Sequence, residues 1–473
     1  MTSALETEIE INAQWRLDPA YKGHRIHDEL LRQEFLSRAE LTAQRDILLR
    51  RQLEHCFDTV PYYQSLFSRS GIKREQLRDP AMLQQLPVLT KADVAANKAA
   101  LVSLQPPPGN GFLGHTETSG TTGEPLIVRQ SERSMGLFRW LKQREYRWYR
   151  FDPGGVLLQI RPPMDLPRPD KDRMIRRDEV LRVARWTMMD NLFMTGSMWG
   201  FSNINSVEAQ GELVEKVRPN YVLMQASCLE HLSLQKFNQK VHVQLRGALS
   251  ISQTLTPAMR TLIEESLRCP VKQNYGLNEI GLVASECQEG GRYHVHVENC
   301  LVELLDTENK PVELGSKGRL VVTSLSNAAM PLLRYETGDM ALAVEPDCSC
   351  GKSLPAFAAV QGRYRRAACL PAGTFQRWAA IQGAIYRAGQ SHQSAVRKYQ
   401  ACQDGAGDFE LRVDCSAEIF EQLQESVRSA FATAVEGQAE APGLSIVRSQ
   451  QFIAGRGNKF EDFISAFTPE MDS

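Results

Sequence analysis

Hydroxyl-bearing and glycine residues form an unbroken run at residues 118–123. Its members are Thr118, Ser119, Gly120, Thr121, Thr122 and Gly123. Glycine lets the main chain turn tightly, so backbone N–H groups and hydroxyls can point together at phosphate oxygens. The run is not a P-loop, because Glu124 follows Gly123 where a P-loop has lysine. The composition is compatible with a phosphate-binding turn and with an ordinary surface turn.

Three later segments carry polar residues that could complete a nucleotide site. They are residues 273–281 (QNYGLNEIG), 330–339 (MPLLRYETGD) and 362–363 (GR). Together with residues 119–125, in this order, they resemble the adenylate-forming superfamily. That superfamily contains acyl-CoA ligases, carrier-protein adenylation domains and luciferases.

The nearest branch of the superfamily is that of the phenylacetate–CoA ligases. The chain is similar to this branch at residues 60–63, 86–93 and 327–331, and the resemblance weakens after about residue 365. It implies an α/β fold with a large multi-subdomain adenylation domain of packed sheets and helices, residues 1–362. A small mobile α+β lid domain, residues 363–473, would follow.

Hydrophobic periodicity by itself also favours an α/β fold. Apolar positions at helical spacing predict two or three helices between residues 25 and 70, broken near Pro61. Short apolar runs alternate with helical stretches, as in buried sheets covered by helices. The runs lie at residues 156–160, 221–224, 248–251, 295–305 and 320–323, and helices are expected at 131–150, 208–217 and 257–267. Further on, the pattern predicts helices at 375–390 and 419–434 and strands at 409–413 and 444–447.

Activation of a carboxylate by ATP requires a site that shields the phosphates, aligns the acid and stabilises the leaving pyrophosphate. The resemblance implies that Glu279 binds Mg²⁺, that Tyr275 stacks on adenine and that Asp339 accepts the ribose hydroxyls. The residues expected to bind ATP are Thr118, Ser119, Gly120, Thr121, Thr122, Gly123, Gln253, Asn274, Tyr275, Gly276, Asn278, Asp339 and Arg363. The residues expected to be catalytic are Lys459, Glu279 and Thr122.

The resemblance implies an ATP- and Mg²⁺-dependent acid–thiol ligase. Such an enzyme forms an acyl-AMP from an aromatic or related acid and passes the acyl group to a thiol, coenzyme A first among the candidates. Arg365 and Arg366 replace the acidic pair that follows Arg363 in phenylacetate–CoA ligases, and Asn278 replaces threonine or serine. Two alternatives therefore stay open. One is acyl transfer to a carrier protein, amine or hydroxyl, as in secondary metabolism, and the other is a nucleotide-binding protein without catalysis.

The acid pocket in this superfamily lies beside the segments near residues 221–227, 248–253 and 275. The residues expected to line it here are Trp199, Met224, Ala226, Ser227, Tyr275 and Gly276. Apolar and aromatic side chains of this kind suit an aryl or medium-sized acid. The same side chains occur in ordinary hydrophobic cores.

Four cysteine and histidine positions form a second group of residues with potential chemistry. Cys287 precedes His294 by seven residues, and Cys348 and Cys350 form a Cys-x-Cys pair. Thiolates with imidazole are the donors that tetrahedral Zn²⁺ prefers, so we expect a structural zinc site. His296 shares a face with His294 in an alternating strand and is an equal candidate by this criterion.

Overall composition excludes several classes of partner. Lysine and arginine (55) balance aspartate and glutamate (56), so no global field favours nucleic acid or an acidic membrane. No apolar stretch reaches the length of a membrane span, and residues 1–12 lack the core of a signal peptide. We therefore expect a cytoplasmic protein with reduced thiols, and the resemblance adds a homodimer as a candidate assembly.

Overall fold

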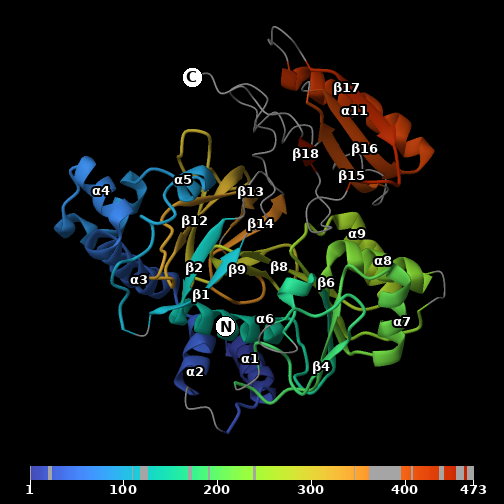
Figure 1. Cartoon of the computed structure of the whole chain (residues 1–473), viewed down its shortest axis with the longest axis horizontal. Coiled ribbons are helices and arrows are strands. Elements are labelled where there is room, and N and C mark those ends of the chain that lie inside the picture. Colours follow the sequence, from blue (N-terminus) through green and yellow to red (C-terminus); the bar gives the residue numbers. More distant parts are fainter. Residues whose placement is uncertain are drawn as a thin grey trace.

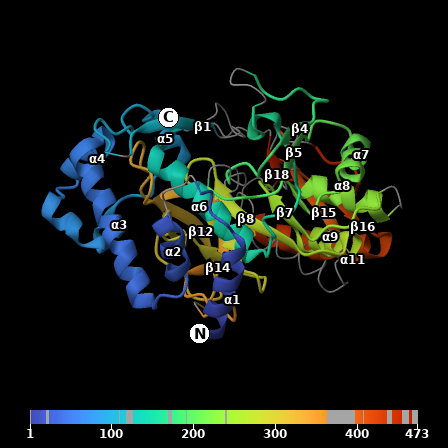
Figure 2. The same ribbon diagram turned by 90° about the horizontal axis from the view of Figure 1, so that it is seen from below.

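The structure of the protein is a computed structural model, shown in Figures 1 and 2. It describes residues 2–19, 24–108, 110–117, 126–168, 173–189, 192–237, 241–345, 347–361, 396–405, 408–435, 442–453 and 463–465. None of the helices in these ranges is both long and apolar enough to cross a lipid bilayer.

A twelve-stranded sheet runs through the larger part of the molecule (Figure 1), in the order β11-β12-β13-β14-β10-β9-β8-β7-β6-β3-β5-β4. Strands β5, β3, β6, β7 and β8 are parallel, and β4 and the strands from β9 onward pair antiparallel. The strands in the first half are β3 (Leu157–Arg161), β4 (Leu181–Val183), β5 (Met198–Ser202), β6 (Tyr221–Gln225), β7 (Gly247–Ile251) and β8 (Val271–Leu277). Those in the second half are β9 (Gly281–Glu286), β10 (Tyr293–Val295), β11 (Cys300–Leu305), β12 (Lys317–Ser324), β13 (Tyr335–Ala343) and β14 (Ala356–Gln361).

Three helices cover one face of the parallel strands. They are α7 (Val207–Val217), α8 (Ala226–Phe237) and α9 (Pro257–Leu267). Their apolar side chains form one cluster with every second residue of the strands, such as Val222 and Met224 of β6. The other residues of the same strand, such as Leu223, belong to the cluster on the opposite face. The alternation of a strand thus sorts its side chains between two apolar layers.

The opposite layer is closed by α6 and the N-terminal helices. Helix α6 (Glu132–Trp148) packs against β9. Its N-cap is Ser131, whose side chain accepts a hydrogen bond from the Ser134 amide. The N-terminal elements are α1 (Thr2–Gln14), α2 (His24–Gln33), α3 (Arg38–Thr59), α4 (Pro61–Arg69), the 3₁₀ helices η1 (Arg74–Arg78) and η2 (Pro80–Gln85), and α5 (Lys91–Ala96). Proline lacks the N–H that would continue α3, so α4 begins as a new helix at Pro61.

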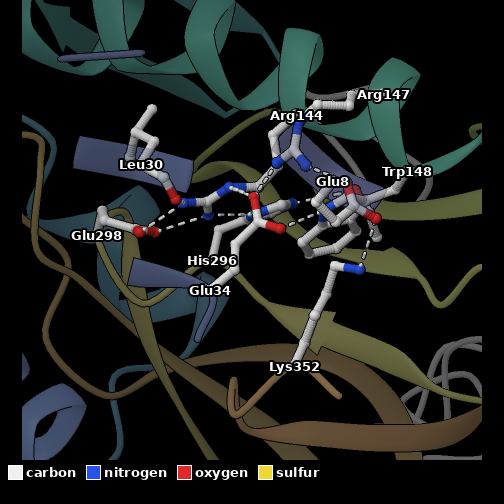
Figure 3. Close-up of polar contacts among 10 residues, drawn as sticks. Glu8, Leu30, Glu34, Arg144, Arg147, Trp148, His296, Glu298 and Lys352 are labelled. Atoms are coloured by element: carbon white, nitrogen blue, oxygen red, sulfur yellow. Dashed lines mark hydrogen bonds and ion pairs between the residues drawn. The ribbon is translucent and has the colours of Figure 1, made fainter. Parts of the chain in front are cut away.

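A buried network of charges joins α1, α2 and α6 to the sheet (Figure 3). The Arg144 guanidinium donates to both carboxylate oxygens of Glu298, at 3.0 and 2.8 Å. The other ion pairs of the network are those of Arg144 with Glu34, of Arg147 with Glu8 and Glu34, and of Arg150 and Lys352 with Glu8. Three carboxylates thus face four cations, which offsets the large cost of removing such charges from water.

A separate four-stranded sheet lies after residue 395. It contains β15 (Val396–Gln403), β16 (Phe409–Cys415), β17 (Leu444–Arg448) and β18 (Phe463–Ser465), in the order β17-β16-β15-β18, with helix α11 (Ala417–Val435). These elements bury a hydrophobic cluster of their own. Strand β15 lies against α9, and Lys398 Nζ is 3.7 Å from a carboxylate oxygen of Glu230 on α8 (Figure 1).

Most predicted elements are confirmed, including the α/β class, the helix break at Pro61 and the strands at 409–413 and 444–447. The run at 295–305 is not one strand, because β10 ends at Val295 and the main chain turns before β11 begins. The Asn299 amide donates to the His296 carbonyl in this turn. Helices α1 and α8 were not anticipated, and the helix predicted at 375–390 lies outside the described residues.

Candidate active site

The strands on either side of the Ser/Thr/Gly run form an antiparallel hairpin. Strand β1 (Phe112–Glu117) pairs with β2 (Ile127–Ser131), and Glu117 faces Ile127 at its open end. The predicted phosphate-binding residues Thr118, Ser119, Gly120, Thr121, Thr122 and Gly123 lie outside the described part of the chain. Glu117 before this stretch and Ile127 after it are paired across the hairpin, so the stretch joins two adjacent strand ends.

This hairpin is hydrogen-bonded to the turn that carries Glu279. The Thr116 hydroxyl donates to the main-chain carbonyl of Asn278 at 2.5 Å. The side-chain amide of Gln130 lies 3.1 Å from the Thr116 hydroxyl and 3.4 Å from the same carbonyl. Two segments about 160 residues apart in sequence thus meet beside the predicted phosphate-binding run. Neither Thr116 nor Gln130 was predicted as a site residue, and only their position beside the run could have suggested them.

Two predicted carboxylates are each held by a tyrosine hydroxyl. Tyr335, the first residue of β13, donates to Oε1 of Glu279 at 2.9 Å. Tyr275 of β8 donates to Oδ2 of Asp339 at 2.8 Å. Burial, together with the charge of Asp339, raises the pKa of Tyr275 well above its ordinary value, so its hydroxyl stays protonated and remains a donor. The structure therefore brings Glu279, Tyr275 and Asp339 together.

The N-terminal segments at 60–63 and 86–93 hold the segment that bears Tyr335 and Asp339. The Leu89 amide donates to the Arg334 carbonyl at 2.9 Å, and the Glu336 amide donates back to Leu89 at 3.0 Å. Tyr63 accepts a hydrogen bond from the Leu333 amide at 2.9 Å. These motif residues therefore act on the site through the main chain of β13 rather than by facing the ligand.

The carboxyl ends of the parallel strands form the floor of the same region. Gln253, which follows β7, accepts a hydrogen bond from the Ser227 amide at 3.0 Å. Its main-chain carbonyl accepts a hydrogen bond from the side chain of Gln273 at 2.7 Å. The side-chain nitrogen of Gln253 is buried and has no partner among the described residues. In open α/β sheets, ligands bind outside the carboxyl ends of parallel strands, which is where this free donor lies.

The residues predicted to line the acid pocket fall into two groups. Met224 and Ala226 are buried in the layer under α7, α8 and α9, and Trp199 packs against that layer. Ser227 is in α8, just beyond β6. Asn274, Tyr275 and Gly276 are in the part of β8 that extends beyond its pairing with β7. The structure places the second group on the side of the nucleotide residues and the first group in the hydrophobic interior.

The four predicted metal ligands lie together. The ligand atoms of Cys287, His294, Cys348 and Cys350 are all within 4.8 Å of one another. Cys287 follows β9, His294 is in β10, and the Cys-x-Cys pair lies in the loop before β14. His296 is not part of this group, because both of its ring nitrogens have other neighbours: Nε2 lies 3.0 Å from the Ser285 hydroxyl and Nδ1 lies 3.3 Å from Nη1 of Arg144.

The spacing of this cluster fits tetrahedral zinc. The sulfurs of Cys287 and Cys348 are 3.6 Å apart, and Cys350 Sγ is 3.3 Å from His294 Nε2. Zinc–ligand bonds of ordinary length place sulfurs about 3.8 Å apart in a tetrahedron and separate sulfur and nitrogen by about 3.6 Å. Hydrogen bonds from Cys287 and His294 lower the pKa of Cys350 to about 3, which favours the thiolate that a metal needs. His294 Nδ1 lies 3.2 Å from the Leu354 carbonyl, the kind of contact that orients a metal-binding imidazole.

Two further predicted residues, Arg363 and Lys459, lie outside the described residues, so their positions relative to Glu279 stay a prediction.

Comparison with known proteins agrees with this geometry. No protein-family model matches the chain. The chain is 25% identical over 339 residues to the phenylacetate–coenzyme A ligase of Thermus thermophilus, covering 70% of this chain and 72% of that one. It is 23% identical over 318 residues to the enzyme of that name from Escherichia coli, covering 64% and 67%. The chain is thus similar to the phenylacetate–CoA ligases of the adenylate-forming superfamily, in agreement with the resemblance of its motifs.

Solved structures give the fold of this superfamily independently. The structure resembles that of 2-hydroxyisobutyryl-CoA ligase in its postadenylation state, with a TM-score of 0.67 and 15% sequence identity. The match covers 92% of this chain and 91% of the other. The likeness thus extends through the C-terminal sheet, where the sequence resemblance is weak.

Proposed function

We propose that the protein is an ATP-dependent acid–thiol ligase. It converts a carboxylic acid into an acyl-AMP with release of pyrophosphate and then transfers the acyl group to coenzyme A. The observation that carries the proposal is the contact between the β1–β2 hairpin and the Asn278–Glu279 turn. This contact brings the strand that leads into residues 118–123 beside the turn that bears Glu279, which supports a nucleotide site shared by the two segments.

Each part of this region has a role in the first half-reaction. The N–H groups and hydroxyls of residues 118–123 would bind the β- and γ-phosphates, and Thr122 would act on the leaving pyrophosphate. Asp339 would accept the ribose hydroxyls, while its contact with Tyr275 fixes the carboxylate beside the adenine site. Such prearranged groups stabilise charge without reorganising during the reaction. Arg363 and Lys459 would contribute further contacts from the C-terminal segment.

Glu279 is the residue that we assign to Mg²⁺. It is 8% exposed, and the one side-chain contact of its carboxylate within the described ranges is that of Tyr335 with Oε1. Mg²⁺ in phosphate-transferring sites is bound by one or two carboxylates together with substrate phosphates. The second oxygen of Glu279 is therefore suited to this role. When bound, the ion would neutralise charge on the phosphates as pyrophosphate leaves.

We assign a structural zinc ion to Cys287, His294, Cys348 and Cys350. Four protein ligands leave no open position for a substrate, so the ion would serve the fold and not the reaction. It would hold the loop before β14 against the β9–β10 hairpin.

We also place the domain boundary at residues 362 and 363, on the basis of the separate sheet and core after residue 395.

Acid-dependent exchange of labelled pyrophosphate into ATP tests the first half-reaction, and thioester formation with coenzyme A tests the second. We expect exchange with a subset of an acid panel, followed by thioester formation with those same acids. Exchange without the thioester would redirect the proposal to a carrier protein, an amine or a hydroxyl as acceptor. Absence of exchange with every acid would overturn it.

A further inference from the structure

Two buried amide side chains lie at the carboxyl ends of the two parallel strands on either side of β3, outside the groups discussed above. Asn203 directly follows β5, and Gln225 is the last residue of β6. They are 5% and 1% exposed. Their side chains are joined by one hydrogen bond, from Asn203 Nδ2 to Gln225 Oε1, at 2.8 Å.

This bond leaves one donor and one acceptor unused. Gln225 Nε2 and Asn203 Oδ1 are buried and have no hydrogen-bond partner within the described ranges. Exchanging nitrogen and oxygen in both amides would reverse the bond between them and would again leave one donor and one acceptor. The pair therefore offers both kinds of polar atom in either assignment.

The main chain around the pair is firmly held, so loose packing does not explain the free atoms. The Asn203 amide donates to the Arg161 carbonyl at 3.0 Å, and the Asn203 carbonyl accepts from Gln210 at 3.3 Å. A buried polar atom without a partner is costly, and most such atoms in folded proteins are paired. The described residues supply no partner for these atoms, which leaves them available to a bound molecule.

The pair lies on the ligand side of the sheet. Strand alternation puts Gln225 on the same face as Tyr221 and Leu223, whose hydrophobic cluster also contains Tyr275. Met224 points to the other face, under α7, α8 and α9. The strand ends themselves are where open α/β sheets bind ligands. Gln225 therefore lies on the same face of the sheet as Tyr275, two strands away in the order β6-β7-β8.

We infer that the acid substrate carries a hydroxyl group on its acyl part, which binds between Gln225 and Asn203. A hydroxyl matches the pair because its oxygen accepts one hydrogen bond while its O–H donates another. A plain aromatic or aliphatic acid would leave both polar atoms buried and unpaired. This inference rests on the proposed ligase activity, because it names the class of acid that the same site selects.

Matched pairs of acids test the inference in the full-length protein. Each pair consists of an aryl or branched aliphatic acid with a hydroxyl at one position and its deoxy analogue, assayed by pyrophosphate–ATP exchange. We expect the wild type to prefer the hydroxylated member of at least one pair by about 100-fold or more in kcat/KM, because sites built to bind a hydroxyl reject analogues without it. Equal rates for both members of every active pair would overturn this inference and leave the proposed function standing. No exchange with any acid would overturn both.

Side-chain variants show whether the pair causes the preference. Gln225→Met should reduce the preference to less than about 10-fold while the KM for ATP stays unchanged. The double variant Gln225→Met with Asn203→Leu should use the deoxy acid more efficiently than the wild type does, because it has no unpaired polar atom at this position. Gln64→Met, at an exposed glutamine bonded to the Asp58 carbonyl, is the matched control and should behave as wild type. An undiminished preference in a folded double variant would overturn the assignment to this pair.

Discussion

The hydroxyl of Tyr335 donates to Oε1 of Glu279 at 2.9 Å, so a residue of β13 orients the carboxylate of the turn between β8 and β9. Both side chains are buried. The relationship ties the segment at 330–339 to the segment at 273–281, which are far apart in the sequence. Leu89 holds the same end of β13 through two main-chain hydrogen bonds, so the carboxylate rests on a rigid support.

Removing the charge of Glu279 tests its metal role. We expect Glu279→Gln to lower pyrophosphate–ATP exchange by about 100-fold or more, because a neutral amide is a poor ligand for Mg²⁺. The Tyr335 contact can persist with the amide oxygen, so thermal unfolding should stay near that of the wild type. Exchange at the wild-type rate would remove the metal role of this residue.

The contact between the hairpin and the Glu279 turn can be broken at one atom. Thr116→Val keeps the side-chain shape but deletes the hydrogen bond to the Asn278 carbonyl. We expect exchange to fall by about 10-fold, mainly through a higher KM for ATP, because one hydrogen bond no longer positions the phosphate-binding run. Thr433→Val, which deletes a hydroxyl bonded to the Ser429 carbonyl on α11, is the matched control. Equal effects of the two variants would contradict the positioning role.

Zinc content and stability should fall together when a ligand is removed. Cys348→Ser is expected to lose the metal and to lower the free energy of unfolding by about 3 kcal/mol or more, since structural metal binding is coupled to folding. Elemental analysis and chemical denaturation measure the two quantities. Cys402→Ser, outside the cluster, should change neither. A native protein without zinc would refute the site.

The network of Figure 3 predicts a large stability effect far from the reaction. Arg144→Met leaves Glu298 buried without its bidentate partner, and we expect the free energy of unfolding to fall by about 3–5 kcal/mol. Arg74→Met is the surface control. Its ion pair with Asp58 is exposed and screened by water, so its loss should change the free energy of unfolding far less. A small effect of Arg144→Met would show that water replaces the hydrogen bonds of the Glu298 carboxylate in the variant.

The predicted catalytic role of Lys459, which lies outside the described residues, can be tested by substitution. Lys459→Ala should lower acyl-AMP formation by about 100-fold, because a cation near the acid and the α-phosphate stabilises charge during attack. Lys310→Ala removes an exposed lysine paired with Glu308 and serves as the control. If acyl-AMP forms normally in Lys459→Ala, another residue fills this role.

Local patterns in the sequence were sufficient for much of the fold. Short apolar runs and helical spacings identified β3, β6 and β7 and the helices α7 and α9, because each pattern reflects burial, but β5, β8 and α8 were missed. They did not identify the turn at 296–299, since a run of apolar residues does not reveal where a strand stops. Nor could they decide between His294 and His296. In the structure His294 Nε2 lies 3.3 Å from Cys350 Sγ, whereas the His296 ring nitrogens lie beside Ser285 and Arg144.

The sequence by itself determined the resemblance to the adenylate-forming superfamily. It also selected Glu279, Asp339 and the four cysteine and histidine positions as candidates, because these depend on residue types at fixed spacing. Only the tertiary structure decided which residues contact them. Thr116 reaches the Asn278 carbonyl and Tyr335 reaches Glu279 through contacts between segments distant in sequence. Such contacts depend on how the sheet is assembled, which no local pattern records.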